Sequence, residues 1–62
     1  MGTTFRAARH GAGISLRKLC ERAEVDFSHV SRWERGQRAI SESTYQHITL
    51  ALADYVAGRW SA

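Results

Sequence analysis

The chain has 62 residues, a formal net charge of +3, one cysteine and no proline. At this length we expect one small domain with a marginal core and too little protein to enclose a deep enzyme pocket. Cys20 cannot pair within the chain, which fits a reducing cytoplasm. The apolar-rich stretch 48–58 is too short to span a membrane, and the first residues lack the apolar run of a signal peptide. We therefore expect a cytoplasmic protein that is neither secreted nor membrane-bound.

Positive charge is concentrated in the first two thirds of the chain. Between positions 15 and 40 there are four acidic residues and six basic ones. The basic residues are Arg17, Lys18, Arg22, Arg32, Arg35 and Arg38. A basic patch is typical of a protein that binds a phosphate backbone. A solvated helical surface would give the same net charge, so charge alone does not decide the function.

Helical periodicity and capping residues predict an all-α fold, because alternation of apolar and polar residues persists nowhere. We expect helices at about 5–10, 16–23, 26–35 and 43–57. The expected N-caps are Thr3 or Thr4, Ser15, Asp26 and Ser43, the last in a capping box with Gln46. Glycines are expected to end three of these helices: Gly11 with Gly13, then Gly36, then Gly58.

Only three residues, 24–26, separate the second predicted helix from the third. Two short helices joined in this way must cross steeply, which is the geometry of a helix-turn-helix. The third helix would then project its outer face into a DNA groove. The same periodicity also fits an ordinary four-helix mini-bundle, so more specific residues are needed.

The segment 14–36 resembles the lambda-repressor and Cro-like helix-turn-helix family. The residues in register are Leu19, Val25, Val30, Ser31, Trp33, Glu34 and Gly36, and the ending Ser-Arg-Trp-Glu-Arg-Gly-Gln-Arg is the most telling part. The resemblance covers about residues 5–56. It implies a compact bundle of four helices, or five, within a single DNA-binding domain over 1–62. The helix-turn-helix is expected at about 15–36, and no enzymatic activity is implied.

Three positions depart from the family pattern. Cys20 replaces a small alanine, and we interpret it as a buried thiol rather than a redox sensor. Glu24 replaces the glycine of the turn, so either it adopts a left-handed conformation at a cost of about 1–2 kcal/mol or the turn is rearranged. Ile40 replaces a proline, and the break before a fifth helix is missing, which favours a longer last helix.

The resemblance also assigns roles to individual residues. Arg9 and Glu34 are expected to form a partly buried ion pair, the alternative being two solvated charges. The expected base contacts are Phe27, Ser28, His29 and Arg32. The expected phosphate contacts are Ser15, Arg17, Ser31, Arg35, Gln37 and Arg38, with Lys18 and Arg22 left open.

The four candidate base contacts differ in chemistry. Arg32 suits bidentate bonding to guanine, whereas Ser28 both donates and accepts and discriminates weakly. Phe27 would contact a thymine methyl or fold back against the turn. His29 would contact a base or a phosphate.

The implied partner is double-stranded DNA, bound by a homodimer on an inverted repeat. The expected dimer contacts are Tyr55, Val56 and Trp60, unless Tyr55 packs in the monomer core and Trp60 lies in a frayed tail. No cofactor is expected. No metal is expected either, because the spacings of His10, His29 and His47 match no zinc pattern.

Three functional interpretations remain. The chain is a Cro-like transcriptional regulator of a phage, mobile element or restriction controller, bound to the nucleoid when active. Alternatively it is an antitoxin or excision-type accessory factor with a protein partner, or a helical interaction module without DNA binding.

Overall fold

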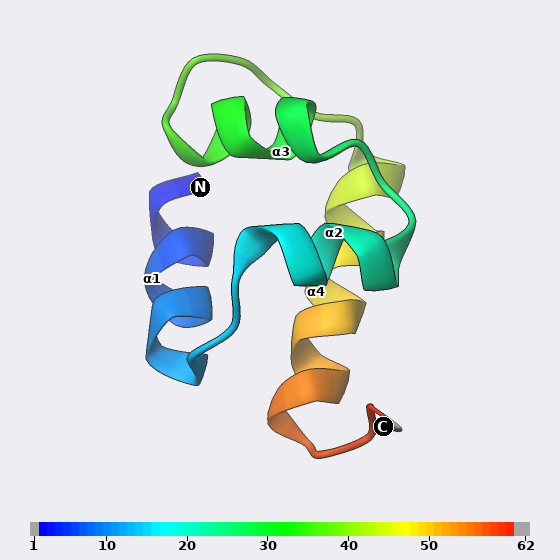
Figure 1. Cartoon of the computed structure of the whole chain (residues 1–62). Coiled ribbons are helices and arrows are strands. Elements are labelled where there is room, and N and C mark those ends of the chain that lie inside the picture. The colour runs from blue at the N-terminus through cyan, green and yellow to red at the C-terminus, as the bar shows by residue number, and fades with distance from the viewer. Residues whose placement is uncertain (1, 61–62) are drawn as a thin grey trace.

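The computed structural model describes residues 2–60 and consists of four helices joined by short connections (Figure 1). They are α1 (Gly2–Ala12), α2 (Leu16–Ala23), α3 (Phe27–Glu34) and α4 (Glu42–Val56). Over these residues no strand is present, which confirms the expected all-α fold, with four helices rather than five. Within the same range, no helix combines the length and apolar character needed to cross a bilayer.

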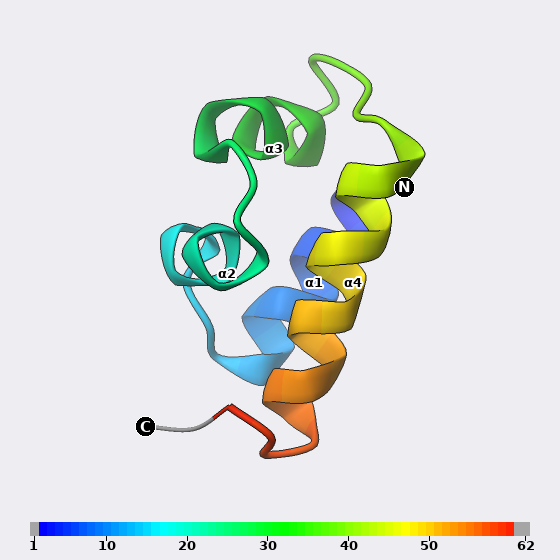
Figure 2. The ribbon, with the colours of Figure 1, turned by 90° about the vertical axis from the view of Figure 1, so that its right-hand side faces the viewer.

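The helices form two layers when the molecule is seen from the side (Figure 2). One layer contains α1 and α4, which both run along the length of the molecule. The other contains α2, seen nearly end-on, and α3 above it. Because α2 packs against α4 and α3, and α1 packs against α3, the outer face of α3 is left uncovered by the rest of the fold.

The core is made by the apolar face of each helix. Leu19, Cys20, Val30 and Ile48 are almost completely removed from solvent. At the junction of three helices, the Phe5 and Trp33 ring centroids lie 5.5 Å apart, and Trp33 meets Tyr45 edge-on at 5.8 Å. Burial of each large apolar side chain stabilises the fold by roughly 1.5–3 kcal/mol.

The expected boundaries of α2 and α3 are confirmed to within a residue or two. The Ser15 hydroxyl accepts a hydrogen bond from the backbone N–H of Lys18 at 3.2 Å, and the Asp26 carboxylate accepts one from that of His29 at 3.2 Å. Gly36 follows α3 with a φ of 76°, a conformation that costs glycine little.

The expected limits of the first helix are wrong. This helix begins at Gly2, ahead of the supposed caps Thr3 and Thr4, and continues through Gly11. Gly11 occupies an exposed helical position, where its cost is only one of helix propensity. Gly13, with a φ of 76°, is the residue that ends the helix.

The expected cap of the last helix is also wrong. Ser41 rather than Ser43 is the N-cap, because its hydroxyl accepts from the backbone N–H of Thr44 at 3.1 Å and donates to the Thr44 hydroxyl at 2.9 Å. The capping box with Gln46 is therefore absent from this end of the helix. Gly58, with a φ of 74°, follows the end of α4 as expected.

In the turn between α2 and α3, the residue with a left-handed backbone conformation is Glu24 instead of the glycine expected from the family pattern. Glu24 has φ 59° and ψ 46°, and its backbone N–H donates to the carbonyl of Glu21 at 3.3 Å. Val25 then donates to the carbonyl of Cys20 at 3.1 Å. The turn of the helix-turn-helix is thus formed in full, and Glu24 bears the conformational cost.

Candidate nucleic-acid interface

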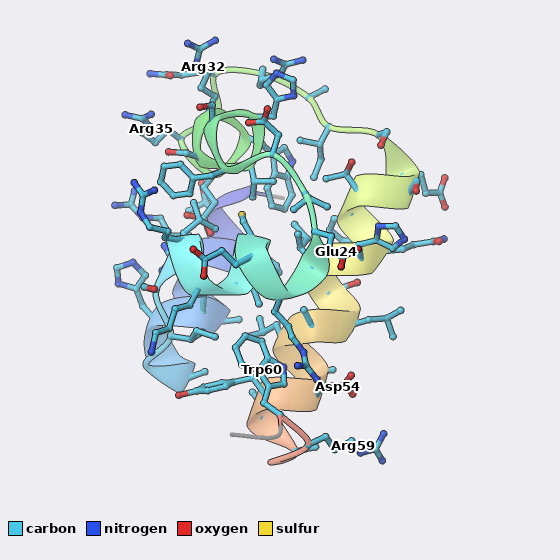
Figure 3. All side chains as sticks on the ribbon, turned by 45° about the vertical axis from the view of Figure 1, so that its right-hand side comes forward. Glu24, Arg32, Arg35, Asp54, Arg59 and Trp60 are labelled. Atoms are coloured by element: carbon cyan, nitrogen blue, oxygen red, sulfur yellow. The ribbon has the colours of Figure 1, made fainter. Side chains whose placement is uncertain are left out.

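The outer face of α3 carries exposed polar side chains. Ser28, His29 and Arg32, three of the four expected base contacts, are all exposed there. Arg32 from this helix and Arg35 from its C-terminal cap project away from the body of the molecule (Figure 3). A helix with an uncovered polar face that carries an exposed arginine has the shape and chemistry needed to enter a major groove.

Phe27, the fourth expected base contact, is partly buried and packs against the core. The guanidinium of Arg17 lies over its ring, 4.5 Å from the centroid. Of the two interpretations of Phe27, this geometry favours folding back against the turn. The residue fixes the start of α3 and positions Arg17 through a cation–π contact.

Asp26 caps α3 where the chain enters the interface. The backbone N–H of His29, which the carboxylate accepts, lowers the pKa of Asp26 below its ordinary value of 3.8. The negative charge also lies at the positive end of the helix dipole. Asp26 is therefore ionised wherever α3 would meet DNA.

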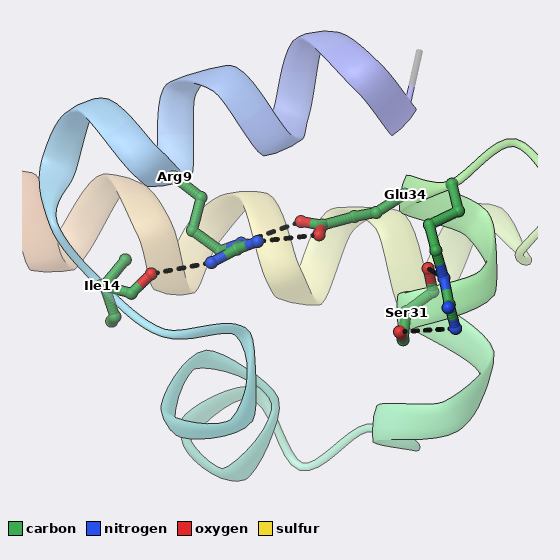
Figure 4. Close-up of polar contacts among 5 residues, drawn as sticks. Arg9, Ile14, Ser31 and Glu34 are labelled. Carbon is green, nitrogen blue, oxygen red and sulfur yellow. Dashed lines mark hydrogen bonds and ion pairs between the residues drawn. The ribbon is translucent and has the colours of Figure 1, made fainter.

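Arg9 and Glu34 tie α1 to the end of α3 (Figure 4). Nε and Nη2 of Arg9 each donate to a carboxylate oxygen of Glu34 at 2.9 Å. Arg9 Nη1 donates to the carbonyl of Ile14 at 3.0 Å. Both residues are buried, with 8% and 4% of their surface exposed, so this is a desolvated, bidentate pair that fixes the orientation of the helices.

Several of the expected phosphate contacts line one hollow of about 440 Å³ between α1, the start of α2, and α3. They are Ser15, Arg17, Ser31 and Arg35. Arg35 is held in place there, since its Nη2 donates to the Ser31 hydroxyl at 3.2 Å (Figure 4). Arg6 also lines the hollow, and sequence reasoning missed it. Its spacing of three residues from Arg9 was the available signal, because it places both on one side of α1.

The remaining basic residues are dispersed. Gln37 and Arg38 are exposed after α3, and Arg38 Nε donates to the Ala39 carbonyl at 3.3 Å. Lys18 is exposed on α2. The guanidinium of Arg22 lies 5.3 Å from the centroid of the Trp60 ring, so Arg22 holds the C-terminal segment.

The three expected dimer residues have different environments. The Trp60 indole N–H donates to the Ala51 carbonyl at 2.9 Å, and its ring meets Tyr55 edge-on at 5.1 Å. Both aromatic rings pack against the core, whereas Val56 is 69% exposed. Trp60 therefore belongs to the fold of the monomer, and the expected alternative of a frayed Trp60 is wrong.

Cys20 is a buried thiol beneath the crossing of α2 and α3. Burial is the main cause that raises the pKa of Cys20 to about 11, with a smaller contribution from Glu34. The thiol is therefore protonated at neutral pH and packs as a small apolar group. Across residues 2–60, no group of three or more histidine, cysteine, aspartate or glutamate side chains is arranged so that it could bind a metal ion.

The fold and this interface together define a helix-turn-helix domain, a class of protein that typically binds DNA and is non-enzymatic. The chain belongs to the helix-turn-helix domain family, whose model matches residues 1–59. This match agrees with the resemblance to the lambda-repressor and Cro-like proteins. No curated protein and no solved structure gave a significant match.

Proposed function

We propose that the chain is a sequence-specific double-stranded DNA-binding regulator that reads the major groove with α3. The observation that carries the proposal is the uncovered face of α3, where Ser28, His29 and Arg32 are exposed together. Arg32 has the planar donor fork that pairs with guanine O6 and N7, the commonest specific contact in the major groove. Ser28 and His29 add weaker discrimination beside it.

Phosphate contacts would orient this helix without reading sequence. The proposed contacts on one side come from Ser15, Arg17, Ser31 and Arg35, and those on the other side from Gln37 and Arg38. The first amide groups of α2 have no partner within the helix and face the same way as the Ser15 cap. The buried Arg9–Glu34 pair would keep α3 at a fixed angle to these contacts.

A single helix reads only a few base pairs, so we infer that two copies bind an inverted repeat. Exposed Val56 is the candidate contact between them, with Tyr55 and Trp60 supporting it from within each monomer. Such a protein would act by occupying its operator in the cytoplasm. Repression by a Cro-like regulator of a phage or mobile element is the simplest outcome of that mode of action.

The test is selection of bound sequences from a random duplex pool at about 150 mM salt. An enriched inverted repeat with half-sites about 10 base pairs apart supports the dimeric operator binder. Arg32→Ala should then lose roughly 1–3 kcal/mol of preference for the selected sequence over an unrelated one. Arg59→Ala, the same loss of charge at the far end of the molecule, should retain that preference. No enrichment by the wild-type chain would contradict the proposal.

A further inference from the structure

The net positive charge of the chain can be traced to one place. Four arginines and one glutamate line the hollow between α1, α2 and α3: Arg6, Arg9, Arg17, Arg35 and Glu34. Their charges leave three positive charges, which equals the formal net charge of +3 for the whole chain. The formal charges of all other arginine, lysine, aspartate and glutamate residues therefore sum to zero. A concave surface with a net positive charge concentrates the electric field and attracts an anion.

Three of these arginines have no acidic partner among the residues that the structure describes. Arg9 is committed to Glu34 through two hydrogen bonds. Arg6, Arg17 and Arg35 are exposed, and none of them takes part in an ion pair within residues 2–60. Guanidinium groups that line one hollow without an anion repel one another. In the isolated chain, the hollow thus has unneutralised positive charge, which a bound anion would neutralise.

Two of the three guanidinium groups are already positioned. Arg35 is bound to the carbonyl and the hydroxyl of Ser31, and Arg17 lies over the ring of Phe27. These contacts reduce the conformational entropy that each side chain would lose on binding. Arg6 makes no side-chain hydrogen bond within the described residues and is free to close over a ligand from the side of α1.

We propose that Arg6 makes α1 part of the DNA-binding surface, by binding one backbone phosphate together with Arg17 and Arg35. This inference rests on the proposed function, because the phosphate would belong to the duplex that α3 reads. A phosphate fits the hollow because arginine forks bind its oxygens bidentately. Arg32 lies in the last turn of α3 and Arg35 caps the end of that helix, so a phosphate at Arg35 would lie beside the bases that Arg32 would read (Figure 3).

A phosphate bound in this hollow would also fix the orientation of the helices around it. Arg6 lies in α1, Arg17 lies in α2 and Arg35 is the C-cap of α3, so one phosphate would hold these three helices at once. The phosphate would therefore fix the angle at which α3 enters the groove. Arg6 is expected to add affinity equally for every sequence, because the phosphate carries no sequence information.

The experiment compares Arg6→Gln with Arg59→Gln. Glutamine keeps helix propensity at position 6, and both variants carry one positive charge less. Arg59 is a matched control, since its side chain is 76% exposed, lies 3.8 Å from Asp54 and sits at the opposite end of the molecule from Arg32 (Figure 3). Binding to one unrelated duplex and to the selected duplex is measured across a salt series. Far-UV circular dichroism and thermal melting check that each variant is folded.

For Arg6→Gln we expect the slope of log K against log salt to become shallower by about 0.9, the value of one phosphate contact. The loss of affinity should be the same for both duplexes, and Arg6→Lys should keep most of the wild-type slope. Arg59→Gln should retain the wild-type slope. An Arg6→Gln slope equal to that of Arg59→Gln would overturn the inference and leave the proposed function standing. Loss confined to the selected duplex would make Arg6 a base contact and also overturn it. A wild-type chain that binds neither duplex would reject both the proposed function and the inference.

Discussion

Arg9 and Glu34 form two hydrogen bonds of 2.9 Å between α1 and α3, inside a domain of only 62 residues. A buried ion pair contributes little net stability relative to an apolar pair, but removal of one partner leaves an uncompensated buried charge. We therefore expect Arg9→Met or Glu34→Met alone to destabilise the fold by about 3–5 kcal/mol. The double variant Arg9→Met/Glu34→Met should lose less than the sum of the two single substitutions.

Equilibrium unfolding in urea measures these losses. A core of this size supplies only roughly 3–5 kcal/mol, so the series is recorded in the stabilising osmolyte TMAO. Some loss remains in the double variant, because Ile14 then has a buried carbonyl without its Arg9 donor. Strictly additive losses would show that the two residues do not act as a pair.

Substitution of Glu24 by glycine is expected to stabilise the domain rather than destabilise it. Its φ of 59° costs a residue with a Cβ about 1–2 kcal/mol, whereas glycine adopts it freely but loses about 0.5–1 kcal/mol more backbone entropy on folding. Glu24→Gly should therefore stabilise the domain by about 0.5–1 kcal/mol in urea unfolding. Glu21→Gly, at an exposed position inside α2, should destabilise it by about 1 kcal/mol. If both variants are destabilised alike, the left-handed conformation carries no cost.

The helix-turn-helix could be predicted from the sequence because its determinants are local. Ser15 and Asp26 each lie directly before an apolar helical pattern, and Gly36 lies directly after one. Each of these residues satisfies backbone groups within about one turn of itself. Only three residues separate the two helices, so little freedom remained for their arrangement.

The end of α1 and the start of α4 could not be predicted, because the sequence offers two equivalent signals for each. Gly11 and Gly13 are both able to end a helix, and Ser41 and Ser43 are both able to cap one. Tertiary packing chooses between them. Gly2 at the start of α1 is buried against α3, a contact between residues distant in sequence.

The hollow and the position of Trp60 depend on tertiary packing in the same way. Arg6 lies in α1, Arg17 lies in α2 and Arg35 caps α3, and no local pattern brings them together. Trp60 binds a carbonyl nine residues earlier, after the chain reverses direction at Gly58. The packing of Phe27 against the core, and the position of Arg17 over its ring, likewise depend on contacts between α2 and α3.

The Asp26 cap makes the stability of α3 depend on pH. Because the pKa of Asp26 is lower in the folded state than its ordinary value of 3.8, its stabilisation is fully present above that value. It is lost as the pH falls through the lowered, folded-state pKa. Asp26→Asn keeps a good N-cap but removes this titration. Relative to Asp26→Asn, the wild-type chain should be more stable near pH 6 than near pH 2.5.

The measurement is the urea midpoint of the wild-type chain and of Asp26→Asn at each pH. The difference between the two midpoints is then compared between pH 6 and pH 2.5. The other carboxylates are shared by both proteins, so their titration cancels. A wild-type advantage that is the same at both pH values would show that the charge on Asp26 adds nothing to the cap.

Gly2 and Gly11 should respond to alanine with opposite signs, although both lie in α1. A Cβ on Gly2 would overlap the carbonyl oxygen of Trp33 and lie 2.9 Å from its carbonyl carbon. These are backbone atoms of α3, which cannot move aside as a flexible side chain would. Gly2→Ala should therefore push α1 away from α3 and destabilise the domain by about 1–3 kcal/mol.

At Gly11 a Cβ would meet no heavy atom within 4 Å. Gly11→Ala should therefore stabilise the domain by about 0.5–1 kcal/mol, through helix propensity and a less flexible unfolded chain. Gly2→Ala should also weaken DNA binding, because its displacement of α1 separates Arg9 from Glu34 and loosens the support of α3. The measurements are urea unfolding and the affinity of each variant for the selected duplex. A Gly2→Ala variant as stable as Gly11→Ala would show that the start of α1 does not need its close approach to α3.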